Sequence, residues 1–193
     1  ADWYDSRLSH LDPRDTWHKS SGRIYRMHAK DAKPSKSFNY GKLSTTELLN
    51  LLGHPNKWHR QTAQRLIADR RNASIVPDLT REFMNLKGQG ALEILWAINH
   101  SGGFTPKFAE KTLTHANPFV RFWTIRLLGD SHLMTPTLRT QLTALAGSEP
   151  NAEVRSCLAA SCKRWAAKDS FPILKQLIRR EEDVKDKHIP LLI

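Results

Sequence analysis

Five arginines recur at matching places along the chain, and guanidinium groups in such a series could hold phosphates or carboxylates. Arg60, Arg121 and Arg155 each follow a Pro and an Asn within one or two turns, and Arg65 and Arg126 come five residues after the first two. Arg60 and Arg121 are 61 residues apart, and Arg121 and Arg155 are 34 residues apart. A structural unit of roughly 30 to 35 residues therefore fits the second interval once and the first interval twice.

Two roles are open for these arginines. On successive parallel helices they could form an exposed basic ridge that binds phosphates or acidic side chains. They could instead form a structural ladder in which Asp69 and Asp130 pair with them on the same or adjacent helices. An arginine near a helix start opposes the helix dipole and therefore favours a carboxylate or carbonyl partner. We expect the structural ladder.

The two cysteines, Cys157 and Cys162, could be metal ligands or a redox pair. On a helix, a spacing of five residues points their side chains about 140° apart, which is unsuitable for a disulfide. Both fall on the apolar stripe of Val154, Leu158 and Trp165, where a free cysteine behaves as a small hydrophobic residue. We expect both in the core.

The nine histidines show neither the His-Glu-x-x-His string nor zinc-type spacing with cysteines, so no metal site is predicted. His59 takes the place that Val120 and Val154 have in the other units, which favours a half-buried, hydrogen-bonded side chain over a ligand. His10 and His18 lie near acidic residues and could belong to a separate site.

Six tryptophans raise the question of base stacking. Trp96, Trp123 and Trp165 fall on apolar helix faces and are expected in the core, whereas Trp58 lies beside a helix start and is expected to be partly exposed. Glu181–Asp183 reads as a solvated turn before a final helix, where acidic residues are favourable.

From Leu43 onward the apolar residues follow a helical period. Ser44 and Glu47 form a capping box that opens a short helix ending at Gly53. A second helix begins near Asn56, and further pairs are predicted at 77–86 with 90–100, 105–115 with 118–130, 135–147 with 151–167, and 170–179 with 184 onward.

The Pro-Asn and Val-Arg pattern of the second helices resembles that of HEAT repeats. Because one pair cannot bury its apolar face alone, neighbouring pairs must stack. We predict an all-α fold, a right-handed, armadillo-like α-α superhelix of HEAT-like repeats over residues 41–193. It would comprise about four and a half helix pairs and be truncated at its C-terminus.

Residues 1–40 have no helical stripe and contain at most one or two strands. Gly22–His28 alternates polar and apolar residues, as a strand does, and Lys30–Tyr40 reads as a linker. The chain start has no signal-peptide pattern, and its last residues stop within an apolar run, so we expect a fragment.

Several strings together resemble one family, the large multidomain proteins of planctomycetes labelled membrane-bound dehydrogenases or haem-binding CxxCH proteins. The strings are Trp3-Tyr4-Asp5-Ser6-Arg7-Leu8-Ser9-His10, Asp12-Pro13-Arg14-Asp15-Thr16-Trp17, Gly22-Arg23-Ile24-Tyr25-Arg26, His54-Pro55-Asn56-Lys57-Trp58-His59-Arg60, Arg126-Leu127-Leu128-Gly129-Asp130 and Asp186-Lys187-His188-Ile189-Pro190-Leu191-Leu192. The resemblance implies a β-propeller whose tail and linker are residues 1–40, then the helical domain, then a c-type cytochrome module.

By that resemblance the segment is a non-catalytic scaffold or protein-interaction domain of an exported, periplasmic protein. Its partners would be the propeller and cytochrome modules or another protein. The chain contains no Cys-x-x-Cys-His string, so haem c is implied only for the downstream module, and a dehydrogenase reaction only for the parent protein.

The charge balance keeps one alternative open. Thirty Lys and Arg against 19 Asp and Glu give a net charge of +11, which favours an acidic partner, although a solvated basic surface is the simpler interpretation. The alternative is a basic HEAT-repeat module that binds nucleic acid, similar to helical-repeat DNA glycosylases. Membrane insertion is not expected, because no apolar run approaches the roughly 18 residues that a span needs.

Overall fold

The computed structural model describes residues 22–25, 27–31, 33 and 38–193. The chain divides into two units, Ala1–Phe38 and Asn39–Ile193, which are considered separately. In the first unit the described residues are exposed, and only Arg23 makes a β-bridge, so the strand predicted over 22–28 is not formed across the part that is described. The candidate site at His10 and His18 lies outside the described residues.

The second unit is all-α. Its elements are η1 (Tyr40–Lys42), α1 (Thr45–Leu51), α2 (Lys57–Arg70), η2 (Ala73–Ile75), α3 (Val76–Phe83), α4 (Gly88–His100), α5 (Pro106–Thr112), α6 (Pro118–Asp130), α7 (Pro136–Ser148), α8 (Ala152–Cys162), α9 (Ala167–Leu177), η3 (Glu181–Asp183) and α10 (Ile189–Leu192).

Two kinds of cap start the helices. The side chains of Asn56, Asn117 and Asn151 accept hydrogen bonds from backbone N–H groups in the first turns of α2, α6 and α8. Thr105 and Thr135 cap α5 and α7 in the same way, and each is followed by a proline at the first helical position. The predicted capping box of α1 is also present.

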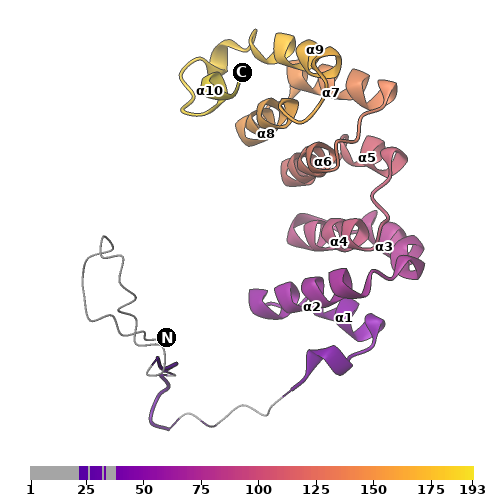
Figure 1. Ribbon diagram of the computed structural model, residues 1–193, viewed down its shortest axis with the longest axis vertical. Coiled ribbons are helices and arrows are strands. Elements are labelled where there is room, and N and C mark those ends of the chain that lie inside the picture. The colour runs from indigo at the N-terminus through magenta and orange to yellow at the C-terminus, as the bar shows by residue number, and fades with distance from the viewer. Residues whose placement is uncertain (1–21, 26, 32, 34–37) are drawn as a thin grey trace, which may run out of the picture. The chain divides into compact units, whose positions relative to one another are not determined.

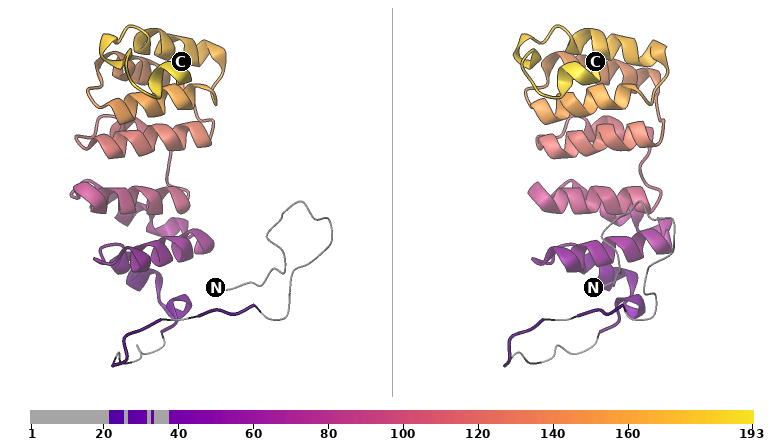
Figure 2. Two further views of the ribbon diagram at one scale, coloured as in Figure 1. Left: turned by 90° about the vertical axis from the view of Figure 1, so that its left-hand side faces the viewer. Right: turned by 60° about the vertical axis from the view of Figure 1, so that its left-hand side comes forward.

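The helices form two layers. In one layer α2, α4, α6 and α8 lie side by side, and in the other α5, α7 and α9 do, while α1 packs on α2 and α3 on α4. Figure 2 shows the same stack from two further directions. Each helix therefore covers the apolar face of its neighbours along the stack. This stacking is required because a single helix pair cannot bury its apolar face alone.

Two clusters of buried side chains run through the stack. One lies among α1 to α4, includes Leu95 and Ile98, and extends to Phe108 of α5 and Val120 of α6. The other lies among α5 to α9 and includes Leu142 and Leu158. Phe104 packs against both clusters.

Of the three tryptophans predicted in the core, only Trp165 is fully buried. Trp165 is buried and donates from Nε1 to the Leu128 carbonyl at 3.2 Å. Trp96 and Trp123 are half-buried and meet edge to face, with ring centroids 5.0 Å apart. Trp58 is exposed.

The C-terminal helices differ from the prediction. α8 ends at Cys162 rather than near 167, because the Ser170 hydroxyl donates to the Cys162 carbonyl at 2.7 Å and satisfies that helix end. The helix predicted from 184 onward is replaced by η3 and the four residues of α10. Among the described residues, no helix has both the length and the apolar character to cross a membrane.

Candidate functional site

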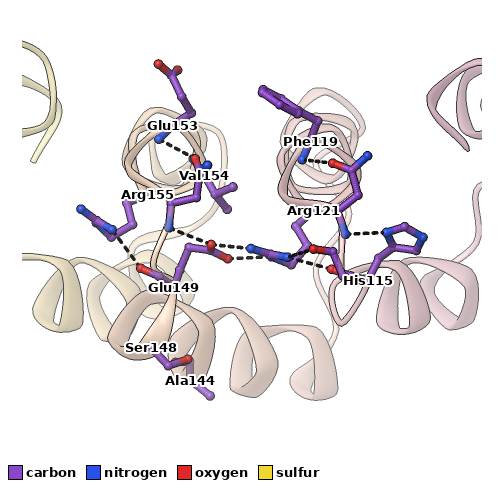
Figure 3. A network of polar contacts seen from close by, with 12 residues as sticks. His115, Phe119, Arg121, Ala144, Ser148, Glu149, Glu153, Val154 and Arg155 are labelled. Carbon is purple, nitrogen blue, oxygen red and sulfur yellow. Dashed lines mark hydrogen bonds and ion pairs between the residues drawn. The ribbon is translucent and has the colours of Figure 1, made fainter. Parts of the chain in front are cut away.

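Arg121 shows how the recurring arginines bind. Its Nε and Nη2 donate to the two carboxylate oxygens of Glu149 at 2.7 and 2.5 Å. Its Nη1 donates to the carbonyls of His115 and Ala116, in the loop before its own helix, at 2.8 and 3.2 Å (Figure 3). One guanidinium thus joins the loop that precedes α6 to the end of α7.

Arg155 repeats this arrangement one pair later. Its Nε donates to Asp183 at 2.6 Å, its Nη2 bonds the other oxygen of the same carboxylate, and its Nη1 donates to the Glu149 carbonyl at 2.9 Å. The side chains of Arg155 and Asp183 are only 5% and 6% exposed. The hydrogen bonds that Arg155 donates to the Asp183 carboxylate raise the pKa of Arg155 above its usual value.

Glu149 links the hydrogen bonds of Arg121 with those of Arg155, as Figure 3 shows. Its carboxylate accepts from Arg121 and from the backbone N–H of Asn151 at 3.0 Å, and its carbonyl accepts from Arg155 and Arg180. A buried carboxylate with this many donors has its desolvation offset by charge-assisted bonds.

Arg60, the first of the three arginines along the chain, is bonded differently. Arg60 Nε donates to Glu93 Oε1 at 2.9 Å, and Nη1 donates to the His54 and Pro55 carbonyls at 2.8 and 2.9 Å. Among the described residues, Arg60 Nη2 forms no hydrogen bond. Glu93 is shared with Gln89, whose Nε2 donates to Oε1 at 2.8 Å.

We call these three pairs, Arg60–Glu93, Arg121–Glu149 and Arg155–Asp183, the arginine ladder. Of the two predicted partners, Asp130 pairs with Arg126, but neither Asp69 nor Asp130 is the partner of a ladder arginine. Each lies nine residues after a ladder arginine on the same helix, which places it on the opposite helix face and roughly 13 Å further along. The real partners come from the next helix pair.

Arg65 and Arg126 stand outside the ladder, and both are exposed. Arg126 pairs with Asp130 one turn later on α6, at 3.1 Å, and Arg164 approaches the same carboxylate at 3.6 Å. Within the described part of the chain, the Arg65 side chain makes no ion pair or hydrogen bond. These pairs argue against an exposed basic ridge, because four of its five guanidinium groups face carboxylates.

Sequence reasoning missed the acidic partners, although a signal was present. Arg121 to Glu149 and Arg155 to Asp183 are both intervals of 28 residues. The prediction of a solvated turn at 181–183 is wrong for Asp183, which is buried, whereas Glu181 and Glu182 are exposed as expected. In the other layer, Arg139 reaches Asp169 at 3.1 Å.

A groove of about 620 Å³ lies beside the first rung. It is lined by α2, α4 and α6, and its walls combine side-chain amides, the two indoles and cationic groups. The lining residues are Lys57, Arg60, Gln61, Gln64, Gln89, Glu93, Trp96, Asn99, His100, Trp123 and Leu127.

Two buried polar atoms of this groove have no partner, Gln64 Oε1 and Trp96 Nε1. Gln64 Nε2 donates to the Glu93 carbonyl at 2.6 Å and to Glu93 Oε2 at 3.1 Å. Because both of those atoms only accept, the amide cannot be turned over, and Oε1 stays unsatisfied. An unsatisfied buried group costs about 1–3 kcal/mol, so a ligand that supplies the missing partners would be favoured.

Both cysteines are buried in the core, as predicted. Burial raises the pKa of Cys157 to about 11 and that of Cys162 to about 12. A thiol with so high a pKa is a weak nucleophile and a weak metal ligand at neutral pH.

His59 is half-buried and contacts Tyr40 through Nδ1, as predicted for a hydrogen-bonded side chain. The His54 ring lies 4.1 Å from it, centroid to centroid. Among the described residues, no cluster of three or more His, Cys, Asp or Glu side chains could hold a metal ion.

Comparisons with models of protein families, with curated proteins and with solved structures found no match to this chain.

Proposed function

We propose that residues 39–193 are a HEAT-like helical-repeat scaffold, without a catalytic centre of its own, that fixes the spacing of neighbouring modules and holds a protein partner. The arginine ladder is the observation that supports this proposal. Each ladder guanidinium is bonded both to its own loop and to a carboxylate of the following pair, so neighbouring pairs are tied by directional bonds as well as by apolar contact.

A spacer of this kind should keep its ends at one distance. We would attach spin labels at Asn50→Cys on α1 and Lys175→Cys on α9, both exposed positions, and measure the distance distribution between them by pulsed electron resonance. The native cysteines are buried, and their raised pKa values protect them from the labelling reagent.

A single narrow distance is expected, and Arg121→Met should broaden it, because the link between α6 and the end of α7 is removed. Arg126→Met, which breaks only an exposed pair within α6, is the matched control and should leave the distribution narrow. A broad distribution in the unmodified chain would contradict the scaffold.

From the resemblance of its sequence strings, we further propose that the scaffold belongs to an exported protein, between a propeller and a c-type cytochrome module. Reading the sequence of the gene on both sides tests this directly. Propeller blades before the segment and a Cys-x-x-Cys-His string after it are expected, and their absence would remove the proposal while leaving the scaffold intact.

Nucleic-acid binding is the weaker candidate. The net charge of +11 and the five recurring arginines favour it, but three of these arginines are neutralised by buried carboxylates. Duplex binding with a steep dependence on salt concentration would reverse this preference.

A further inference from the structure

The end of the groove nearest the start of α2 is cationic. Lys57 is the first residue of that 14-residue helix, and Arg60 follows one turn later on the same face. Glu93 takes one N–H of the Arg60 fork, whereas the two N–H groups of Nη2 are left without a bond in the described structure. An oxyanion here would meet an ammonium, an unused guanidinium edge and the positive end of a helix dipole.

The middle of the groove requires something that a bare anion lacks. Gln64 Oε1 needs a hydrogen-bond donor, and Trp96 Nε1 needs an acceptor. Phosphate and carboxylate oxygens only accept, so they could satisfy the indole but not the amide. A ligand that fits both must carry a donor and an acceptor, as the edge of a nucleobase does.

The far wall offers flat aromatic surface. Trp96 and Trp123 both line the groove, and their rings cross at 77°. Stacking of a base on such a ring stabilises binding regardless of which base it is. A neutral sugar would leave the cationic end unused, and a peptide of Asp and Glu alone would have no planar ring to stack on the indoles.

We propose that this groove binds a nucleoside monophosphate unit, with the phosphate at Lys57 and Arg60 and the base against Trp96, Trp123 and Gln64. The volume of about 620 Å³ lies within the range of roughly 300–1,000 Å³ that small-ligand sites occupy. Because Gln64 Oε1 and Trp96 Nε1 are buried, binding requires a side chain of the groove to rotate and expose them.

The indole N–H signals of the full chain provide the readout. In a ¹H–¹⁵N spectrum of protein labelled at tryptophan, Trp96→Phe and Trp123→Phe assign the two groove signals, and Trp165, already bonded in the core, serves as the reference. AMP should shift the two groove signals saturably and leave the Trp165 signal in place. Adenosine and inorganic phosphate, which each fill half of the groove, should bind at least tenfold more weakly.

A second set of titrations separates the sources of the same unit. If a tetranucleotide shifts the groove signals at lower concentration than AMP, the unit comes from a nucleic-acid strand, and if AMP binds more tightly, it comes from a free nucleotide. Either result supports the proposal. No shift at 10 mM AMP, about the weakest binding worth testing, would overturn it. So would equal binding of an acidic tripeptide or a neutral trisaccharide.

Lys57→Gln should weaken AMP binding about tenfold, because it removes a charge-assisted bond at an exposed position. Lys168→Gln on α9 is exposed, lies outside the groove and makes the same charge change, so it should leave the affinity unchanged. Equal weakening by both variants would mean general electrostatic attraction and would overturn the assigned phosphate position. The proposed nucleotide site and the proposed scaffold are tested independently, because the spin-label distances do not depend on AMP.

Discussion

The two ends of the arginine ladder use the same motif with different results. At Arg155, both Nε and Nη2 donate hydrogen bonds to the carboxylate of Asp183, and the pair is almost completely buried. At Arg60 the carboxylate of Glu93 takes a single N–H and is shared with two glutamines, and an open groove lies alongside. The third rung is closed and structural, whereas the first keeps unused hydrogen-bonding groups.

The origin of the acid explains this difference. Glu149 lies two residues before the cap Asn151, and Asp183 lies in η3, so both come from segments between helices that face the arginine of the preceding unit. Before α4, the segment Met84–Lys87 has no carboxylate, and Glu93 from inside the helix replaces it.

A rung is also missing from the ladder. In α4, Ala91 occupies the place four residues after the cap where the other helices carry arginine. His115 then lies where Glu149 lies one unit later, and its side chain accepts one hydrogen bond, from the backbone N–H of the cap Asn117 at 3.0 Å. Neither Ala91 nor His115 lines the groove with Trp96 and Trp123, and His115 instead lines a separate pocket with Phe83 and Phe108.

The largest test of the comparison is Arg155→Met. It leaves the Asp183 carboxylate buried without its cation, so we expect the free energy of unfolding to fall by about 3–5 kcal/mol. Urea denaturation followed by circular dichroism measures this change. Arg126→Met, in an exposed pair, should change it by less than about 1 kcal/mol. Similar losses in both variants would mean that the third rung is not specially stabilising.

Arg60→Met should cost less, about 1.5–3 kcal/mol, the range for hydrogen bonds to charged groups. Glu93 would keep the bonds from Gln64 and Gln89, so its charge is not left without donors. The same denaturation experiment measures this loss. A loss equal to that of Arg155→Met would contradict the distinction between an open and a closed rung.

The caps give a finer comparison. The Asn151 side chain accepts from two backbone N–H groups, those of Glu153 and Val154, whereas Asn56 accepts only from Trp58. Replacement of a cap by alanine costs typically about 1 kcal/mol. We expect Asn151→Ala to exceed Asn56→Ala by a few tenths of that energy, measured by the shift of the urea midpoint, and the reverse order would contradict the geometry.

The helices could largely be predicted from the sequence, because apolar spacing, Asn and Thr caps and the Ser44–Glu47 box are local signals. The arginine positions could be found in the same way. Their partners could not, because a carboxylate 28 residues away is a matter of how pairs stack, and Asp69 and Asp130 were nearer along the chain but on the wrong face. The groove was missed for the same reason, since its amides lie on separate helices.

The smallest effect concerns His115, at the missing rung. Burial lowers its pKa below the usual 6.5, so the unfolded chain binds a proton more readily than the folded one. The stability that this neutral side chain contributes is therefore complete above about pH 6.5 and is lost as the pH falls below that value. Urea midpoints measured between pH 8 and pH 5 should decline on the acid side.

His115→Asn removes the titrating group and keeps an oxygen that can accept from the Asn117 N–H, so the acid-side decline should become shallower while stability at pH 8 stays nearly unchanged. His100, whose pKa is also lowered by burial, supplies a remaining slope that His100→Asn should remove separately. If His115→Asn leaves the acid-side decline unaltered, the surroundings of His115 do not keep its side chain neutral. The position of the missing rung is then an ordinary solvated turn, and not one where a neutral acceptor has replaced a carboxylate.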